Sequence, residues 1–422
     1  MKILLIGSGG REHAIAHSLK RSPSCTKLFI APGNPGTARL GENVNLDSNN
    51  HSAIEKFCTE MAVELVVIGP ENPLAEGLGD FLRKCGIPVC GPGKAGADLE
   101  ASKDYSKAFM LRHDIPTAKY KSFKSGEEKE ANQYIQNHSI PIVVKASGLA
   151  AGKGVVICED RNNAERIVHE MLSGSVFGNA GRTVVIEEFL SGIEVSVFIL
   201  TDGTDYILLP EAKDYKRIFE GDKGPNTGGM GAVSPVPFAD ADFMQKVKSK
   251  IIDPTIKGLK EEAIPYRGFI FFGLISVLDE PYVIEYNCRM GDPESEVVFP
   301  RILSDMAEIL FDCAIGQLGT RSLLIDPRDC VTVMMVSKGY PEAYEKGKEI
   351  QMKGDQPDEN LVFHAGTRLE DEKLLTNGGR VLAVTAFGNT RSAALQNAYR
   401  GIKSISFEGH FYRRDIGKDL GE

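Results

Sequence analysis

The stretch YVIEYNCRMGDPE, residues Tyr282 to Glu294, leads a short apolar run directly into a polar loop. Side chains of an extended strand alternate between two faces, so the pattern predicts that Val283, Glu285 and Asn287 share one face. That face would carry a carboxylate next to an amide oxygen. Mg²⁺ prefers oxygen ligands of this kind, so Glu285 and Asn287 are the predicted metal-binding pair.

The preceding run, GFIFFGLISVL (Gly268 to Leu278), is also strand-like. Asp279-Glu280-Pro281 supplies a polar turn, which predicts a hairpin of two strands. A lone Glu-x-Asn pair is more often a half-buried strand followed by an acidic loop. The metal interpretation therefore depends on the other motifs of the chain.

Length and composition narrow the class of protein. A chain of 422 residues with 42% apolar residues predicts about three domains. Its net charge of -9 argues against nucleic-acid and anionic-membrane partners, which need a basic face. No apolar run reaches the ~18 residues of a membrane span. The eight cysteines form no C-x-x-C pair, so we expect reduced thiols and a cytoplasmic protein.

The N-terminal stretch predicts a buried strand, the glycine turn of GSGGREHA, and a helix start that can bind phosphate. The third glycine of the dinucleotide fingerprint is replaced by Glu12, and no ribose-binding acid follows the strand Lys27 to Ala31, so NAD is not expected. We interpret His13 and His17 as ordinary helix residues. Strands, helices and glycine loops alternate up to Glu100, which predicts a doubly wound α/β domain.

A second glycine loop, Ser147 to Gly154, lies between the strand Ile142 to Lys145 and the run Val155 to Ile157. It does not have the spacing of the Walker loop. Flanking strands predict a flexible hairpin lid, from which Lys145 and Lys153 can reach phosphates.

The segment Thr183 to Leu200 predicts two strands joined by an acidic link. Exposed backbone around Glu187 to Leu190 could hold adenine, and Glu194 a ribose. A simple meander with solvated glutamates is the alternative. The glycine- and proline-rich loop Gly221 to Pro237 predicts an ordered functional loop.

Taken together, the motifs GSGGREHA, APGNPGT, GPENPL, KASGLAAGKGV, IEEFLSGIE, GPNTGGMGAVSP, EYNCRMGDPE and YRRDIG resemble the phosphoribosylamine-glycine ligase (glycinamide ribonucleotide synthetase) family of ATP-grasp enzymes. The resemblance covers almost the whole chain. Met290 departs from the phenylalanine that is commoner there, and Ala212-Lys213 replaces a pair in which glutamine often precedes the aspartate. The first strand of the metal hairpin also lacks the extra carboxylate of some ATP-grasp relatives.

The resemblance implies three domains of mixed α/β and α+β class. Residues 1–101 would form the doubly wound parallel-sheet domain, residues 102–314 a two-lobed ATP-grasp domain with its lid near 147–154, and residues 326–422 a small α+β domain.

The resemblance also implies the reaction and its partners. ATP, with Mg²⁺ or Mn²⁺, would drive attack of glycine carboxylate on the γ-phosphate. The amine of 5-phosphoribosylamine would then displace phosphate from glycyl phosphate. We expect a monomer.

Site residues follow from the same resemblance and from the motifs above. The predicted nucleotide-binding residues are Lys103, Lys145, Gly152, Lys153, Gly154, Glu187, Glu188, Leu190 and Glu194. The predicted substrate-binding residues are Gly9, Gly10, Arg11, Glu71, Asp214, Thr227, Gly228, Gly229, Arg289 and Asp292. Of these, Arg289, Asp292 and Asp214 are predicted to be catalytic: Arg289 would meet the acyl or transferred phosphate, and Asp292 the amine of glycine.

Three alternatives stay open from the sequence. Another ATP-grasp ligase would share the first half-reaction but differ in the GPNTGGMG and RMGDPE loops. A nucleotide sensor without catalysis would bind ATP and need no metal pair. A purely structural α/β protein would need none of these loops.

Overall fold

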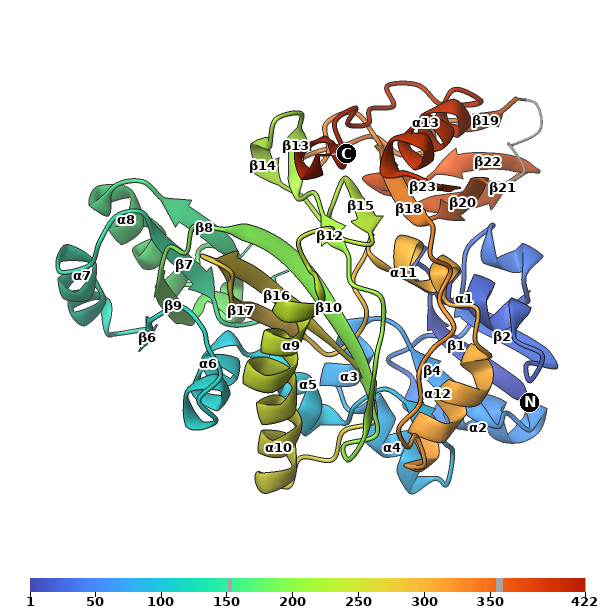
Figure 1. The fold of residues 1–422 in the computed structure, drawn as a ribbon, viewed down its shortest axis with the longest axis horizontal. Helices are drawn as coiled ribbons and strands as arrows, with labels where there is room; N and C mark the ends of the chain where they lie inside the picture. The colour runs from blue at the N-terminus through green and yellow to red at the C-terminus, as the bar shows by residue number, and fades with distance from the viewer. Residues whose placement is uncertain (151–153, 354–359, 422) are drawn as a thin grey trace.

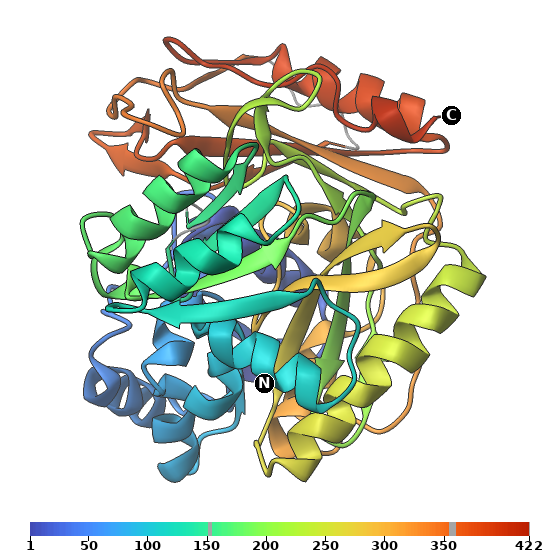
Figure 2. The same ribbon diagram turned by 90° about the vertical axis from the view of Figure 1, so that its left-hand side faces the viewer.

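The computed structural model of the protein describes residues 1–150, 154–353 and 360–421 (Figure 1). An N-terminal parallel sheet, a central part with two lobes and a C-terminal sheet follow one another along the chain. Figure 2 shows the C-terminal sheet across the top, with the other two parts beneath it. Within the described ranges, no helix is long and apolar enough to cross a membrane.

The N-terminal domain is a five-stranded parallel sheet in the order β3-β2-β1-β4-β5, which confirms the doubly wound prediction. Its strands are β1 Lys2–Gly7, β2 Lys27–Pro32, β3 Glu42–Asn43, β4 Leu65–Ile68 and β5 Val89–Cys90. Its helices are α1 Gly10–Arg21, α2 His51–Met61, α3 Glu71–Ala75, α4 Leu78–Lys84 and α5 Lys94–Ala101, with a 3₁₀ turn at Thr37–Arg39. The strand order reverses beside β1, so the loops after β1 and β4 open into one crevice.

The central part contains two four-stranded sheets. The smaller lobe consists of β6 Tyr120–Lys124, β7 Ile142–Ala146, β8 Val155–Cys158 and β9 Thr183–Glu188, with helices α7 Glu128–Gln136 and α8 Arg161–Leu172 and a 3₁₀ turn at Gly178–Gly181. The larger lobe consists of β10 Ile193–Thr201, β11 Tyr206–Leu208, β16 Gly268–Val277 and β17 Glu280–Asn287, with α6 Lys103–Arg112, α9 Ala241–Val247, a π-helical segment Lys248–Ile252 and α10 Asp253–Glu261. The chain crosses between the sheets after β9, as predicted for the acidic link.

The cores of the two lobes differ. The smaller lobe has a hydrophobic core of its own, built from β6 to β9 and the two helices that cover them. The inner face of the larger sheet shares a core with the N-terminal domain, in which Val283 and Tyr286 are both buried. The hairpin that carries the predicted metal ligands is therefore fixed to the N-terminal domain.

The β16–β17 hairpin corrects two details of the sequence interpretation. Its turn is Leu278-Asp279, both with positive φ, and Glu280 already belongs to β17. Two left-handed residues match the twist of paired strands, so the turn is tighter than expected. In addition, the pairing shifts between Gly273 and Leu274, which leaves Ile284 as the extra residue of a β-bulge.

The C-terminal sheet has the order β12-β15-β18-β23-β20. Its long strands are β18 Asp329–Val336, β20 Asn360–His364 and β23 Arg380–Gly388, and α13 Arg391–Ile402 packs against them. Two short strands from the central part complete it, β12 Lys213–Asp214 and β15 Gly231–Ser234. The predicted ordered loop is thus anchored by strand pairing to the C-terminal domain.

The remaining short elements surround these sheets. They are β13 Arg217–Phe219, β14 Lys223–Asn226, α11 Ser295–Arg301, α12 Met306–Ile315, β19 Gln351–Met352, β21 Thr367–Glu370, β22 Lys373–Thr376, β24 Ile405–Ser406 and a 3₁₀ turn at Lys418–Leu420.

Candidate active site

Glu285 and Asn287 do share one face of β17. Glu285 pairs with Gly273 and Asn287 with Phe271, on the regular side of the bulge. The expectation that Val283 shares this face is wrong, because the bulge at Ile284 reverses the alternation and turns Val283 into the core. The metal pair depends on the short regular stretch after the bulge.

The donor set of this pair fits a hard divalent cation. Asn287 is only 9% exposed, and within residues 1–150, 154–353 and 360–421 neither its amide nor the Glu285 carboxylate has a hydrogen-bond or ion-pair partner. A buried polar group without a partner is costly, so a ligand at this position would satisfy it. Among the described residues, no cluster of three His, Cys, Asp or Glu side chains could hold a metal alone. Mg²⁺, which keeps water and phosphate ligands, matches a two-residue site.

Lysine side chains face this pair from the other elements of the cleft. Lys145 on β7 and Lys107 on α6 place their ammonium groups 2.9 and 3.1 Å from Oε2 of Glu187. Burial lowers the pKa of Lys107 to about 8, although Glu187 opposes the shift. Burial also lowers the pKa of Lys103, against the attraction of Glu285. The predicted nucleotide site therefore gathers positive charge opposite the metal pair.

The acidic link between the lobes is more tightly held than a solvated turn would be. Glu187 is buried between its two lysines, and its other oxygen, Oε1, has no partner in the described residues. The Glu188 carboxylate accepts a 2.8 Å hydrogen bond from the Lys119 amide. Leu190 is half-buried in the crossing segment. The meander with solvated glutamates does not describe this segment.

The lid strands are arranged as the glycine pattern predicts. β7 and β8 pair as an antiparallel hairpin, in which the Gly154 carbonyl accepts from the Ala146 amide. The two other predicted lid residues, Gly152 and Lys153, lie outside the described residues.

Asp214, Glu194 and Lys216 form one cluster beside Glu285. The Lys216 ammonium pairs with the Glu194 carboxylate and lies 3.4 Å from Oδ1 of Asp214. Lys216 lowers the pKa of Glu194, whereas burial raises the pKa of Asp214. The two carboxylates outweigh the effect of burial and raise the pKa of Lys216 well above its usual value. The sequence identified both acids but not Lys216, which stands two positions after Asp214 in the link between β12 and β13.

Glu294 is a further buried acid beside this cluster that the sequence interpretation did not single out. Ser196 donates a 3.0 Å hydrogen bond to its Oε1. Burial, reinforced by the Asp214 charge, raises the pKa of Glu294 to about 7. A group that titrates near neutrality inside a cleft is a candidate for proton transfer.

Arg289 connects the metal strand to the N-terminal domain. Its Nη2 lies 2.7 Å from Oε1 of Glu100, and its Nε lies 3.4 Å from Oε2 of Glu71. Arg11 reaches the same Glu71 oxygen at 3.8 Å. Burial works to lower the pKa of Arg289, but the two glutamates raise it above its usual value. Sequence reasoning missed Glu100 as a partner of Arg289, because the two residues are 189 positions apart along the chain.

The N-terminal glycine turn is arranged around Glu12. A Cβ at Gly7 or Gly69 would come 2.3 Å from the Glu12 side chain, and Glu12 Oε2 accepts a 2.7 Å hydrogen bond from the Gly9 amide. At Gly10 the close neighbour is Glu296, 2.2 Å from a Cβ position. The glycines are therefore required by internal packing, and the start of α1 points into the crevice with acids around it.

Asp292 and the GPNTGGMG loop meet at the opposite wall. The Thr227 hydroxyl donates to the Lys216 carbonyl at 2.8 Å and accepts from the Gly229 amide at 2.9 Å. A Cβ at Gly229 would come 2.3 Å from Pro293, the residue after Asp292. Arg380, which sequence reasoning missed, lies 3.0 Å from the Asp292 carboxylate.

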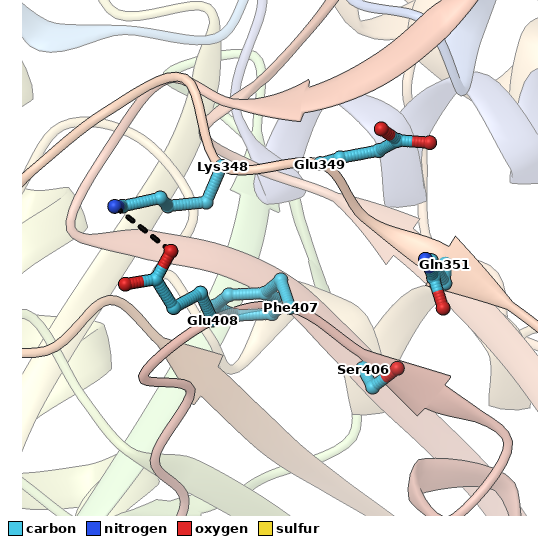
Figure 3. A pocket seen from close by; sticks show the side chains of 6 residues that line it. All are labelled: Lys348, Glu349, Gln351, Ser406, Phe407 and Glu408. Atoms are coloured by element: carbon cyan, nitrogen blue, oxygen red, sulfur yellow. Dashed lines mark hydrogen bonds and ion pairs between the residues drawn. The ribbon is translucent and has the colours of Figure 1, made fainter.

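A separate pocket on the C-terminal domain contains none of these residues. It is lined by Lys348, Glu349, Gln351, Ser406, Phe407 and Glu408 (Figure 3). Lys348 and Glu408 form a 3.0 Å ion pair at its edge, so the charges there are already matched by one another.

Two antiparallel lobes with a glycine-rich hairpin, inward lysines and an oxygen-donor pair on the facing strand define an ATP-grasp carboxylate-amine ligase. Fold comparison agrees. The biotin carboxylase domain of Hydrogenobacter thermophilus 2-oxoglutarate carboxylase, solved with MgADP, superposes with a TM-score of 0.72 over 97% of this chain and 91% of that one. At 17% identity this likeness concerns the fold alone.

Family models for phosphoribosylglycinamide synthetase match three segments: the N domain at residues 1–100, the ATP-grasp (A) domain at 101–295 and the C domain at 330–419. The phosphoribosylamine-glycine ligase of Rhizobium meliloti is 45% identical over 417 residues, 99% of this chain and 98% of that protein. The solved phosphoribosylamine-glycine ligase of Thermotoga maritima has a TM-score of 0.87 at 36% identity, covering 99% of this chain and 100% of that one. This chain belongs to the phosphoribosylglycinamide synthetase family, which confirms the resemblance and the three-part fold.

The chain also matches a larger relative. The trifunctional purine biosynthetic protein adenosine-3 of Gallus gallus is 46% identical over 422 residues, 99% of this chain but 42% of that protein. The chain thus spans less than half the length of this relative.

Proposed function

We propose that this chain ligates glycine to 5-phosphoribosylamine in the cleft between β17, the lid strands and the N-terminal crevice. The reaction consumes ATP and yields glycinamide ribonucleotide, ADP and phosphate, a step of purine biosynthesis. The observation that carries the proposal is a pair of oxygen donors, Glu285 and Asn287, whose side chains have no partner among the described residues and which lie near Lys103, Lys145 and Arg289.

The nucleotide would lie between the two lobes. Lys145 and Lys103 neutralise charge on the phosphates, while the crossing segment from Glu187 to Leu190 offers backbone groups to the adenine. Glu194, turned into the cleft by Lys216, is the candidate partner for a ribose hydroxyl. Bound Mg²⁺, or Mn²⁺, would neutralise charge on the transferred phosphoryl group while it is held by Glu285 and Asn287.

The first half-reaction needs no protein nucleophile. Glycine carboxylate attacks the γ-phosphorus and ADP leaves, which forms glycyl phosphate. Asp292 would hold the glycine ammonium and so orient the carboxylate toward the phosphate. Arg289, kept protonated and fixed by Glu71 and Glu100, would stabilise the negative charge of the acyl phosphate.

In the second half-reaction the amine of phosphoribosylamine attacks the glycyl carbonyl carbon and phosphate leaves. The 5-phosphate would bind at the start of α1, where it would take the place of the Glu12 and Asp292 carboxylates that accept from the Gly9 and Arg11 amides. Glu71 would lie near the ribose. Thr227, Gly228 and Gly229 would close the opposite side around glycine, next to Asp214. Water must be excluded, because it would hydrolyse the acyl phosphate.

The location of the reaction is also a proposal. All eight cysteines are free thiols, which supports a reducing compartment such as the cytoplasm.

A turnover experiment tests the proposed function. Purified protein with ATP and Mg²⁺ should release ADP at a substantial rate only when glycine and phosphoribosylamine are both present, and mass spectrometry should detect the amide product. A nucleotide sensor would bind ATP without turnover. Another ATP-grasp ligase would release ADP with a different carboxylate or amine acceptor, and either result would reject the proposal.

A further inference from the structure

We propose that Arg380, the first residue of β23 in the C-terminal domain, is a positioning residue for the glycine site. Its guanidinium fixes the Asp292 carboxylate and the Gly228 peptide in the orientation that receives glycine. The inference rests on the proposed function, in which Asp292 binds the glycine ammonium.

Three contacts from one nitrogen carry the proposal. Nη1 of Arg380 donates to the Gly228 carbonyl at 2.6 Å and to the Asp292 carbonyl at 2.8 Å. The same nitrogen lies 3.0 Å from Oδ1 of Asp292. The Arg380 side chain is 20% exposed and that of Asp292 is 15% exposed, so solvent screens the ion pair only weakly. Both predicted substrate loops are therefore bound to the same cation.

The backbone amide of Gly228 is held as well as its carbonyl. Tyr340, likewise in the C-terminal domain, accepts a 2.9 Å hydrogen bond from the Gly228 amide through its hydroxyl oxygen. A Cβ at Gly228 would approach the Arg380 guanidinium carbon to 2.9 Å. The C-terminal domain thus forms a wall of the proposed active site through two side chains that hold the two consecutive peptide groups on either side of the Gly228 Cα.

A neighbouring acid explains why Asp292 needs this cation. Glu296 on α11 is fully buried, and neither of its carboxyl oxygens has a hydrogen-bond partner in the described residues. Burial, reinforced by the Asp292 charge, raises the pKa of Glu296 well above its usual value, which favours the neutral form of this group. Two carboxyl groups this close favour only one charge. Arg380 stabilises that charge on Asp292, the residue that faces the cleft.

The guanidinium is suited to this role in a way that an ammonium is not. It is planar and presents several N–H groups in a fixed geometry, whereas the lysine ammonium is a point charge on a flexible stem. Replacement by lysine should therefore preserve the charge but loosen the orientation of the two loops.

The test compares Arg380→Met, Arg380→Lys and a control, Arg368→Met, by steady-state kinetics. Arg368 belongs to the same domain but its side chain is 43% exposed, and it forms a surface ion pair with Glu370. We expect Arg380→Met to raise the KM for glycine at least about tenfold, with the KM for ATP changed less than about twofold. Arg380→Lys should fall between it and the parent protein, and Arg368→Met should match the parent protein.

Single and combined variants of Asp292 and Arg380 distinguish this inference from the proposed function on which it rests. If Asp292→Asn leaves the KM for glycine unchanged, the assignment of Asp292 itself is rejected. If Asp292→Asn raises this KM but Arg380→Met does not, only the positioning role is rejected. The combined variant should be worse than Asp292→Asn by less than the full effect of Arg380→Met, because part of that effect acts through the Asp292 carboxylate. Losses that multiply, or an equal rise in the KM for ATP, would overturn the inference. Thermal unfolding of each variant identifies any that fail to fold.

Tyr340→Phe removes the hydroxyl that accepts from the Gly228 amide and leaves Asp292 and Arg380 in place. It should raise the KM for glycine less than Arg380→Met does.

Discussion

The Lys145 ammonium donates a 3.2 Å hydrogen bond to the backbone carbonyl oxygen of Ile284. Lys145 belongs to the smaller lobe, and Ile284 is the extra residue of the bulge in β17 of the larger lobe. The bulge thus does two things: it turns Val283 into the core while Glu285 and Asn287 stay together on the other face, and it offers a carbonyl that links Lys145, the proposed phosphate-binding lysine, to the strand of the proposed metal ligands. Bulges next to active sites often re-aim side chains in this way.

Removal of the metal carboxylate should abolish ligation without unfolding the protein. Glu285→Ala takes away a polar side chain that has no protein partner in the described residues, so core packing is unaffected. We expect the turnover number to fall by about 100-fold or more, and by less in Asn287→Ala. ADP release measured across a Mg²⁺ titration checks this expectation.

The matched control for this prediction is Glu280→Gln on the same strand. Glu280 pairs with Lys246 and Lys250 at the protein surface, far from the cleft end of β17. Its turnover should equal that of the parent protein. Near-normal turnover of Glu285→Ala at moderate Mg²⁺ would show that the metal assignment is wrong.

A small change opposite the metal ligand should weaken the site indirectly. A Cβ at Gly273 would lie 3.1 Å from Cγ of Glu285, which is tight enough to displace the side chain by a few tenths of an ångström. We therefore expect Gly273→Ala to raise the Mg²⁺ concentration for half-maximal rate several-fold while KM for glycine stays constant. An unchanged Mg²⁺ dependence, measured in a variant with parental thermal stability, would mean that Glu285 does not bind the metal.

The sequence predicted the hairpin, the lid strands and the parallel sheet because each has strong local periodicity. It could not predict the bulge at Ile284, since a bulge is defined by the register with a partner strand. It also missed β12 and β15, whose two and four residues are too short to show a period. β15 forms because β18, more than 90 residues later, supplies its pairing partner, and β12 in turn pairs with β15.

Residues of the site were predictable where the chemistry lies within one motif. Glu285, Asn287 and Arg289 stand in a single stretch, so their types and spacing were sufficient. Arg380 and Glu100 act through contacts that span 88 and 189 residues of sequence. In a single sequence, nothing distinguishes such an arginine or glutamate from one that lies on the protein surface. Only the folded chain shows which of them meet the motif.

Acid should destabilise the contact between the N-terminal and C-terminal domains. His13 on α1 and His364 on β20 are buried, and His17, one turn further along α1, is half-buried. Burial lowers the pKa values of His13, His17 and His364 to about 3, 4 and 4. Each folded pKa lies below the unfolded value of about 6.5, so the unfolded state binds more protons as pH falls through this window. The contribution of these histidines to the free energy of unfolding is therefore full above about pH 6.5 and is lost as the pH falls toward 4. Urea unfolding at pH 7 and pH 5 should show the loss.

A histidine replacement isolates this effect. His17→Leu removes a ring whose Nδ1 has no partner in the described residues and which packs edge-on against Phe363. Its stability should decline less between pH 7 and pH 5 than that of the parent protein, while His51→Leu on α2 should decline equally. If His17→Leu and the parent protein lose the same free energy of unfolding, His17 does not titrate as its burial requires.

The N-terminal glycine turn should affect phosphoribosylamine and spare ATP. Gly9 has an extended backbone that valine tolerates, but a Cβ there would lie 3.0 Å from Oε2 of Glu12 and 3.6 Å from Oδ2 of Asp292, so the branched side chain would fill the crevice at the start of α1. We expect Gly9→Val to raise the KM for phosphoribosylamine at least about tenfold, and Gly9→Ala to raise it less. ATP binding measured by calorimetry should be unchanged, because the proposed nucleotide site lies between the two lobes of the central part. Equal losses for both ligands, or an unaltered constant for phosphoribosylamine, would exclude this turn as the phosphate site.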